Sequence, residues 1–332
     1  MRRRSSAPLA LALATAVLVL PWLGPSAPDA APKKLAMIMP GSIQDADYNT
    51  IGYVALQELR KAYDMDVAYS ESVAVADAER VGREYVAAGY EVVAFHGGQF
   101  TTIAKKLSTQ FPQTVFIQEA SGPMTDAGAN LWVIGRKWYQ GFYALGAAAA
   151  LATKTNKVGF VGGVRIPDVV SSINAVAQAV RDHNSKAQFV WNVIGDFNDP
   201  VKARQTAEAQ MGAGVDVIVP FINLGLYGLV EGVKASPKPV LLTTFQTAKW
   251  DLAPKHFMGS LLVDFVGPYK EVVTRIGKGE RKGYYEMRPG RGMSLSEIRN
   301  VPPEVAAKVK AIFQEVVAGK PLAEITDKLP AQ

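Results

Sequence analysis

Short apolar runs alternate along the chain with longer stretches in which apolar residues recur at helical spacing. Short runs rich in Val and Ile are typical of strands buried on both faces of a parallel sheet. The predicted strands are Val67–Tyr69, Val92–Phe95, Val115–Ile117, Leu131–Ile134, Val158–Val161, Phe189–Val193, Val215–Val219 and Val240–Leu242. The predicted helices between them include Asp77–Ala88, Ile103–Gln110, Gly141–Ala152, Val169–Asp182, Pro200–Ala213 and Tyr227–Ala235. This alternation predicts an α/β fold built from βαβ units.

The predicted strands fall into two successive groups, which favours two parallel sheets over a single (β/α)₈ barrel. The barrel remains the structural alternative, although Ser121–Asn130 is too short to hold a crossover helix between its flanking strands. We expect this segment to be the first crossing between two lobes, and a second crossing near Thr243–Thr247. Later, Tyr284–Arg291 predicts a hairpin or an extended crossing, and Pro302–Ala318 predicts a closing amphipathic helix.

The stretch Lys34–Leu59 carries the clearest ligand-binding signal. An apolar run, a polar loop with a glycine, and apolar residues at helical spacing together predict a strand–loop–helix unit. Ligands of α/β proteins bind at the carboxyl ends of strands. Here the loop supplies an aromatic ring, amides and carboxylates that suit a flat polar ligand: Gln44, Asp45, Asp47, Tyr48 and Asn49. The alternative is that Asp47 or Asn49 caps the helix and Tyr48 packs on the core.

Residues 1–31 have the pattern of a signal peptide that is removed from the mature protein. Three arginines at residues 2–4 precede the apolar run Leu9–Leu23, and small residues follow it. The run is short and contains Pro21, so a permanent membrane anchor is the less favoured alternative. The chain has no cysteine, which excludes a lipid-modified cysteine and disulfides. We therefore expect a periplasmic protein that is not a lipoprotein.

Composition and motifs give little support for catalysis or for nucleic-acid binding. The net charge of +6 is spread over single residues and pairs, which argues against a nucleic-acid partner. His96, His183 and His256 lie far apart and outside any metal-binding motif, so each is expected on the surface or in a loop, although His96 ends a predicted strand and could touch a ligand. Gly159–Gly163 matches no dinucleotide or phosphate fingerprint and predicts a tight turn. We expect no cofactor, no metal and no catalytic residue; an exported α/β hydrolase acting on nucleosides is the alternative of another class.

Several segments, taken in order, resemble the basic membrane protein family of substrate-binding proteins for ABC importers. The first is the strand–loop–helix GSIQDADYNTIGYVAL, in which a Gly, an Asp and an aromatic–Asn pair precede the helix. The others are FHGGQFTTIAKKLSTQFPQTVFIQ, RKWYQGFYALGAAAAL, VGFVGGVRIPDV, GDFNDPVKARQTAEAQMGAGVDVIV and VPPEVAAKVKAIFQEVVAGK. Each motif is weak alone, but their order and spacing are fairly specific. The resemblance covers about residues 34–325.

The resemblance implies a type I periplasmic-binding-protein fold: two Rossmann-like lobes with parallel sheets flanked by helices, and three crossings between the lobes. The N-terminal lobe is expected to hold residues 33–122 and about 247–278, and the C-terminal lobe about 130–243 and 283–325, with a ligand cleft between them. The expected protein is a monomer without enzymatic activity that closes around a small molecule and delivers it to an ABC permease in the inner membrane. Better-known members of the family bind purine nucleosides.

The resemblance also assigns roles to individual residues. Tyr48 matches the aromatic that stacks on the base in the first lobe, and Phe197 matches its partner in the second lobe. Glu119 matches an acidic position that accepts hydrogen bonds from the base, with a solvated loop carboxylate as the alternative. Together with their neighbours, the candidate ligand-binding residues are Asp45, Asp47, Tyr48, Asn49, Gly97, Gly98, Gln99, Glu119, Trp138, Phe197, Phe221, Thr244, Phe245 and Trp250.

Two positions depart from the family pattern. The aspartate and lysine that the family uses for ribose correspond to Thr244 and Val263, which removes the groups best suited to sugar hydroxyls. Aromatic residues gather in the nearby loops instead, although hinge and core packing would also account for some of them: Phe221, Tyr227, Phe245 and Trp250. We therefore expect a purine base or a similar small heteroaromatic. An intact purine nucleoside is the main alternative, with Asp251 or Asp264 supplying the carboxylate.

Overall fold

The computed structural model describes residues 31–331. The expected signal peptide therefore lies outside the described residues, except for Ala31. Within this range, twelve strands form a sheet with the order β2-β1-β3-β4-β5-β11-β12-β10-β9-β8-β6-β7. Neighbouring strands are parallel except β10 and β12, which are antiparallel. Because β2 and β7 stand at opposite ends of this order, the sheet is open and the barrel alternative is wrong.

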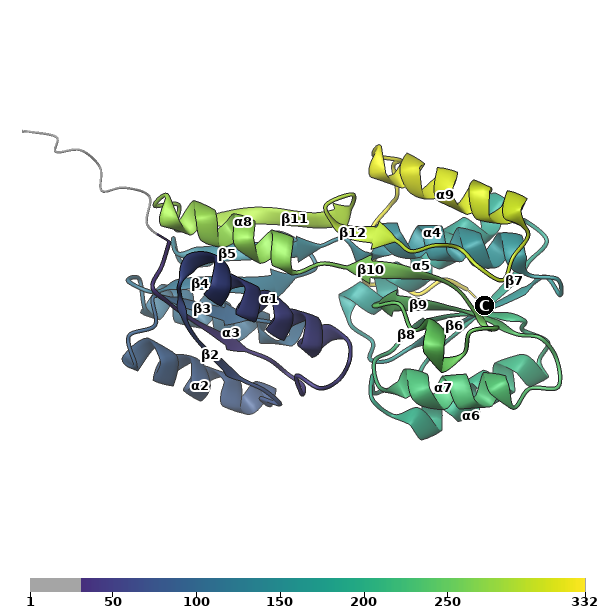
Figure 1. Ribbon diagram of the computed structural model, residues 1–332, viewed down its shortest axis with the longest axis horizontal. Coiled ribbons are helices and arrows are strands. Elements are labelled where there is room, and N and C mark those ends of the chain that lie inside the picture. Colours follow the sequence, from purple (N-terminus) through teal and green to yellow (C-terminus); the bar gives the residue numbers. More distant parts are fainter. Residues whose placement is uncertain (1–30, 332) are drawn as a thin grey trace, which may run out of the picture.

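The sheet consists of two halves of six strands, which lie side by side in Figure 1. The first half contains β2 (Asp66–Ser70), β1 (Lys34–Ile38), β3 (Val92–Phe95), β4 (Val115–Ala120), β5 (Leu131–Arg136) and β11 (Gly283–Pro289). The second half contains β12 (Gly292–Leu295), β10 (Phe257–Val263), β9 (Leu241–Gln246), β8 (Val217–Phe221), β6 (Lys157–Gly162) and β7 (Gln188–Val193). The two halves meet where β11 pairs with β12.

Helices flank both halves of the sheet (Figure 1). Those of the first half are α1 (Tyr48–Tyr63), α2 (Val75–Ala87), α3 (Thr101–Gln110) and α8 (Val266–Gly277). Those of the second half are α4 (Trp138–Ala152), α5 (Pro167–His183), α6 (Pro200–Gly212), α7 (Gly225–Lys234) and α9 (Pro303–Val317). Two short 3₁₀ helices, Gly98–Phe100 and Trp250–Leu252, follow the ends of β3 and β9.

The central strands are apolar on both faces because helices cover both faces. In β1, Leu35 and Met37 pack in a core with residues of α1 and α8, whereas Ile38 packs in a separate core with residues of α2 and α3. The second half repeats this plan, with α4 and α5 on one face and α6 and α7 on the other. Continuous burial of Val/Ile-rich strands is the signature of a doubly covered parallel sheet.

Helix α4 is buried on nearly every side, which explains its small and apolar sequence. A Cβ atom at Gly146 would lie 2.8 Å from the Cα atom of Val176 in α5, so the glycine lets these two helices approach closely. Helix α9 packs on α4, and Val309, Ile312 and Val316 are buried as its amphipathic pattern predicts. These contacts hold α5 and α9 against α4 in the second half.

The predicted strands and helices are present, with boundaries that differ by a few residues. The largest shift concerns β9, which begins at Leu241 and continues to Gln246, four residues beyond its predicted end at Leu242. The lobe boundaries need a larger correction. Leu131–Arg136 pairs with β4 and lies in the first half, so Ser121–Asn130 connects neighbouring strands and is no crossing. Likewise β10 pairs with β9, so the segment near Thr243–Thr247 and the strand that follows it remain in the second half.

The three crossings between the halves lie later in the chain than expected. They follow β5 into α4, β10 into α8, and β11 into β12. The physical reason for the first error is that a ten-residue loop can return to a neighbouring parallel strand without a helix, although such connections usually contain one. The stretch Tyr284–Arg291, expected as a hairpin or crossing, is the extended strand β11 that leads into the third crossing.

Candidate functional site

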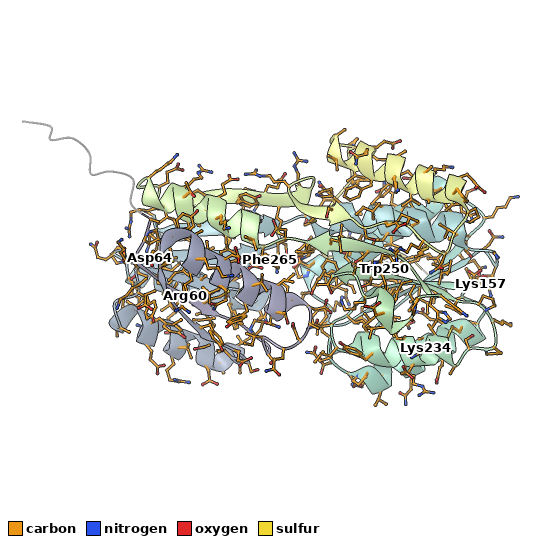
Figure 2. All side chains as sticks on the ribbon, in the orientation of Figure 1. Arg60, Asp64, Lys157, Lys234, Trp250 and Phe265 are labelled. Carbon is orange, nitrogen blue, oxygen red and sulfur yellow. The ribbon has the colours of Figure 1, made fainter. Side chains whose placement is uncertain are left out.

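A cavity opens between the two halves of the sheet, next to the carboxyl ends of several strands. Its volume is about 180 Å³. The first half contributes Pro40, Gly41, Tyr48, Asn49, Gly98, Gln99 and Arg136; the second contributes Trp138, Ile166, Asp168, Phe197, Asn198, Phe221, Ile222, Asn223, Phe245 and Gln246. Figure 2 places the side chain of Phe265 at the junction of the halves, and this ring packs edge-on against Tyr48 with 5.6 Å between centroids.

Asp45 shapes the loop that brings Tyr48 and Asn49 to the cavity. Its carboxylate accepts hydrogen bonds from the backbone N–H groups of Asp47 (2.9 Å), Asn49 (3.0 Å) and Thr50 (3.0 Å). It also accepts one from Nδ2 of Asn223, in the other half, at 2.9 Å. Burial raises the pKa of Asp45, but the hydrogen bonds from Asn223 and the backbone outweigh burial and leave the pKa below 3.8. Asp45 is therefore a charged cap for α1 and does not line the cavity.

Asp47 forms an ion pair between the halves. Its carboxylate accepts hydrogen bonds from the Lys249 ammonium and, at 3.0 Å, from the Thr247 hydroxyl, both in the loop after β9. Asp47 and Lys249 are 3% and 8% exposed. Burial raises the pKa of Asp47 to about 6, although Lys249 and Thr247 act in the opposite direction. The pair therefore bridges the two halves beside the cavity instead of facing a ligand.

Glu119 is fully buried at the end of β4 and is surrounded by donors. Its oxygens accept hydrogen bonds from the hydroxyls of Tyr48 (2.7 Å) and Tyr269 (2.8 Å), and they also contact Nδ1 of His96 and, at 3.4 Å, Nη1 of Arg136. Burial raises the pKa of Glu119, but His96 and Arg136 lower it by more than burial raises it. The pKa is therefore below its usual value and the group stays ionised. Glu119 therefore holds Tyr48 in place from behind and has no contact with the cavity.

His96 is completely buried, which contradicts its expected place on the surface or in a loop. Its Nδ1 atom faces Glu119 and its Nε2 atom lies 2.9 Å from the backbone oxygen of Tyr48. Both partners are acceptors, so the ring satisfies both when each nitrogen carries a proton. The ring also stacks on Tyr48, with 4.2 Å between centroids. A Cβ at Gly52 would overlap the His96 ring, so glycine at this position of α1 is required by the packing.

Arg136 is a charged group on the cavity wall, which also holds its ion-pair partner Asp168. Nη1 donates to the Tyr48 hydroxyl at 2.6 Å, and Nη2 donates to Asp168 at 2.9 Å. The guanidinium lies 5.7 Å from the centroid of the Tyr48 ring and 5.6 Å from that of Trp138, which places it within reach of cation–π attraction. Since Asp168 belongs to α5 and Arg136 to β5, this ion pair also joins the two halves.

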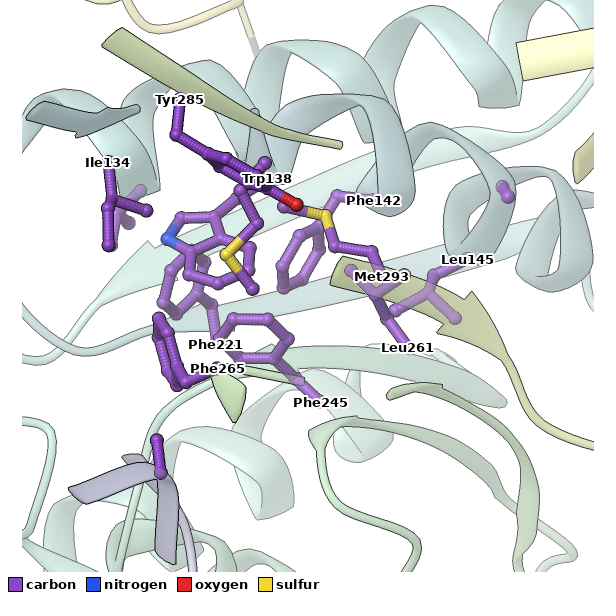
Figure 3. Close-up of a cluster of buried hydrophobic side chains, with 14 of the residues drawn as sticks. Ile134, Trp138, Phe142, Leu145, Phe221, Phe245, Leu261, Phe265, Tyr285 and Met293 are labelled. Carbon is purple, nitrogen blue, oxygen red and sulfur yellow. The ribbon is translucent and has the colours of Figure 1, made fainter. Parts of the chain in front are cut away.

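Aromatic rings of the second half form an apolar wall, part of which is seen in Figure 3. Trp138 packs edge-on against Phe245 with 5.1 Å between ring centroids, and the centroids of Phe245 and Phe221 are 4.8 Å apart. Phe197 continues the series at 6.2 Å from Phe221. A Cβ at Gly163 would overlap Phe197, so this glycine, the first residue after β6, makes room for the ring.

The structure brings together eight of the fourteen candidate residues. Those that line the cavity are Tyr48, Asn49, Gly98, Gln99, Trp138, Phe197, Phe221 and Phe245. Those outside its lining are Asp45, Asp47, Gly97, Glu119, Thr244 and Trp250. Thr244 is buried in β9, and the Trp250 ring lies 4.7 Å from the Arg299 guanidinium, away from the junction (Figure 2). Asp251, Val263 and Asp264 are also outside the lining.

Sequence reasoning missed five polar residues of the cavity wall. Arg136, Asn223 and Gln246 lie at or just after the carboxyl ends of β5, β8 and β9. Asp168 lies in the first turn of α5, and Asn198 lies in the loop before α6. The available signal was a polar residue directly after an apolar run, which marks the ligand edge of a parallel sheet. Gln246 carries a further sign that only the structure shows, a backbone φ of 75°. Such strained non-glycine residues cluster at functional sites.

Comparison with known proteins decides the family. A family model described as "ABC transporter substrate-binding protein PnrA-like", named Bmp, matches residues 32–287. The chain belongs to this family. The resemblance found in the sequence motifs is thereby confirmed, and substrate binding for an ABC transporter is the function of the Bmp family.

Curated relatives of this Bmp protein carry several names. The CD4+ T-cell-stimulating antigen of Listeria monocytogenes is 30% identical over 306 residues, which cover 84% of each chain. A purine-binding protein of Brucella abortus is 25% identical over 264 residues, 74% of this chain and 71% of its own. A Haloferax volcanii protein named for glucose binding is 33% identical over 165 residues, but this chain spans only 41% of its length.

Solved structures similar to this Bmp protein include two ABC transporter solute-binding proteins. That of Conexibacter woesei has a TM-score of 0.70 at 23% identity and covers 87% of this chain and 98% of its own. That of Aeropyrum pernix has a TM-score of 0.75 at 17% identity and covers 89% and 94%. These likenesses, with the open parallel sheet and its three crossings, confirm the type I periplasmic-binding-protein fold.

Residues 31–331 contain no group of three or more His, Cys, Asp or Glu side chains placed to hold a metal ion. In the same range, no helix has both the length and the apolar character needed to cross a membrane.

Proposed function

We propose that this protein captures a purine base, or a similar small heteroaromatic, for an ABC importer. In this proposal residues 1–31 are removed as a signal peptide, the mature protein works as a monomer in the periplasm, and an inner-membrane permease receives the ligand. The main support for this proposal is the cavity at the junction of the halves, which is lined by aromatic rings from both. These are Tyr48 of α1 in the first half, and Trp138, Phe197, Phe221 and Phe245 of the second half.

A flat ring suits this cavity because aromatic pairs gain about 0.5–1.5 kcal/mol beyond simple burial when they stack or meet edge to face. Closure of the halves would bring Tyr48 and Phe197 to the ligand together, so binding and closure would be coupled. Amides and the Arg136–Asp168 pair add hydrogen-bonding groups between the rings. Such a mixture of an apolar wall and a few fixed polar groups is typical of small-molecule sites.

The cavity favours a free base over an intact nucleoside. The two positions that correspond to ribose-binding residues of the family, Thr244 and Val263, do not line it. Gln246, at the end of β9, does line the cavity, and its side chain is a neutral amide. The confined space of about 180 Å³ also favours the smaller ligand. An intact purine nucleoside remains the competing proposal, and the printed name of the Haloferax volcanii relative makes glucose a necessary comparison.

Calorimetric titration of ligand-free protein with adenine, hypoxanthine, guanine, their nucleosides and glucose tests this proposal. We expect a 1:1 complex with at least one base and weaker binding of the matching nucleoside. Phe197→Ala should weaken base binding roughly tenfold, the equivalent of about 1.4 kcal/mol, because a ring on the wall is lost. Tyr227→Ala is the matched control, since Tyr227 is 41% exposed and outside the cavity. Tight nucleoside or glucose binding without base binding would overturn the proposal.

A further inference from the structure

Three side chains on the cavity wall have buried polar atoms without a hydrogen-bond partner among residues 31–331. These atoms are Nε of Arg136, Oδ1 of Asn223 and Oε1 of Gln246. Arg136 and Gln246 are 4% and 8% exposed. Buried polar groups are nearly always paired in native proteins, so each exception needs an explanation. All three side chains line the same cavity, which points to the ligand as their missing partner.

The free donor of Arg136 has a fixed direction. Its two terminal nitrogens are held by Tyr48 and Asp168, and the planar guanidinium cannot turn without breaking those bonds. Arginine has donors only, so the ligand must present an acceptor to Nε–H. A carbonyl oxygen suits this donor best, because it has two lone pairs and accepts over a broad range of angles.

The charge of Arg136 is already balanced. Asp168 forms an ion pair with it at 2.9 Å, and Glu119 lies 3.4 Å away. Asp45 is a further charged carboxylate close to the cavity, hydrogen-bonded to the lining residue Asn223. An anionic ligand would therefore add negative charge to a site that has no unbalanced positive charge in this network. A neutral acceptor therefore suits Arg136 better than an anionic one.

Asn223 needs the opposite group. Its Nδ2 atom donates to the Asp45 carboxylate at 2.9 Å, and a carboxylate can only accept. The amide orientation is therefore settled, and Oδ1, on a residue that lines the cavity, is a buried acceptor without a partner among residues 31–331. The ligand must bring an N–H or O–H donor to it. Gln246 adds a second unpaired amide oxygen from the end of β9.

We infer that the ligand is a neutral oxopurine, such as hypoxanthine or guanine, whose carbonyl oxygen accepts from Arg136 Nε–H while a ring N–H donates to Asn223 Oδ1. This inference rests on the proposed function and makes it more specific. Arg136 comes from the first half and Asn223 from the second, so both bonds form together only when the halves are closed. In the orientation in which the hypoxanthine carbonyl meets Arg136, adenine has an amino group at that position and would set a donor against the Arg136 donor.

The ligand panel tests the inference on the unmodified protein. Hypoxanthine should bind at least tenfold tighter than adenine, and at least tenfold tighter than urate, which is an anion at neutral pH. Equal or tighter binding of adenine, or of urate, would overturn the inference while leaving capture of a purine intact. Failure of every purine to bind would instead remove the proposed function itself. The two failures are therefore distinguishable.

A variant and a spectroscopic measurement test the role of Arg136 directly. Arg136→Lys keeps the charge and removes Nε–H, and should weaken hypoxanthine binding at least tenfold. Arg165→Lys is the control, because Arg165 is exposed and outside the cavity lining. In ¹H–¹⁵N spectra of the wild type, one arginine Nε–H signal, absent from Arg136→Lys, should shift when hypoxanthine binds. If Arg136→Lys does not fold, binding of the ligand panel to the wild type still tests the inference. An Arg136 Nε–H signal that does not shift in a saturated complex would refute the contact.

Discussion

Glu119 shows how a residue can match an expected site and still serve another purpose. The sequence placed it at the end of a buried strand, beside the expected ligand. The structure places it there too, but Tyr48, His96 and Tyr269 occupy its oxygens. Tyr269 is 150 residues away along the chain, in a helix that crosses back to the first half. No local pattern could reveal that partner. The carboxylate was expected at the ligand, whereas the structure shows it bonded to Tyr48 and outside the cavity lining.

The charge of Glu119 is expected to be important for stability. Glu119→Gln replaces an oxygen by an amide N–H₂ group that faces donors, and leaves Arg136 without part of its counter-charge. Breaking a buried ion pair by removing one partner costs about 3–5 kcal/mol. Urea unfolding should show a loss of this size, whereas the exposed Glu304→Gln should change the free energy of unfolding by less than about 0.5 kcal/mol. Equal losses in the two variants would contradict the network described for Glu119.

Asp47 should make stability depend on pH in an unusual direction. Its pKa is raised from 3.8 to about 6 in the folded protein, so the folded state binds the proton more tightly than the unfolded state. The contribution of Asp47 is therefore most favourable below pH 4 and is lost as the pH rises to about 6. The unfolding free energy of the wild type minus that of Asp47→Asn should fall by about 1–3 kcal/mol across this window. A constant or rising difference would show that this pKa is not raised.

At the scale of elements, helix α1 depends on a close fit to the strand ends beneath it. A Cβ at Gly52 would overlap the His96 ring. Gly52→Ala should therefore destabilise the protein by about 1–3 kcal/mol through overpacking, although alanine favours helix by up to about 1 kcal/mol. Gly212→Ala in α6 is the control, because its Cβ would meet nothing within 4 Å. Thermal unfolding should show opposite shifts; a stabilised Gly52→Ala variant would mean that His96 moves freely.

The elements were largely predictable because their signals are local. Runs such as Val92–Phe95 are short, apolar and β-branched, and they coincide with strands. Asp45 shows the limit of such reasoning. The sequence suggested Asp47 or Asn49 as the cap of α1, but the carboxylate that receives the amide hydrogens of the first turn is that of Asp45. The loop bends at Ala46, whose φ is 58°, and this bend brings the earlier aspartate under the helix.

At the scale of the molecule, the order of strands was harder to predict than their existence. Both β5 and β10 pair with the strand before them, and the chain leaves each half only afterwards. A short connection was taken for a crossing because it lacks a helix. The same limit applies to the cavity. Phe197 was identifiable from the family pattern, whereas Arg136 and Asn223 acquire their roles only from partners in the other half.

Polar contacts join the halves and are expected to favour the closed arrangement, among them Asp45–Asn223, Asp47–Lys249 and Arg136–Asp168. Lys249→Met removes one of them and should shift ligand-free protein toward an open form with a larger radius of gyration in small-angle X-ray scattering. Saturating ligand should reduce the difference from the wild type. Lys255→Met, at an exposed position outside the ligand cavity, should scatter like the wild type. Identical curves for all three proteins would show that the Asp47–Lys249 pair does not influence closure.

Mass spectrometry of the small molecules released by denaturing freshly purified protein tests the central claim most directly. The account predicts a free purine base, and an oxopurine if the contacts of Arg136 and Asn223 are correct, in a ratio approaching one per protein molecule. Detection of a sugar or an intact nucleoside at that ratio would contradict the claim that a base is the ligand, while the fold and the family would stand.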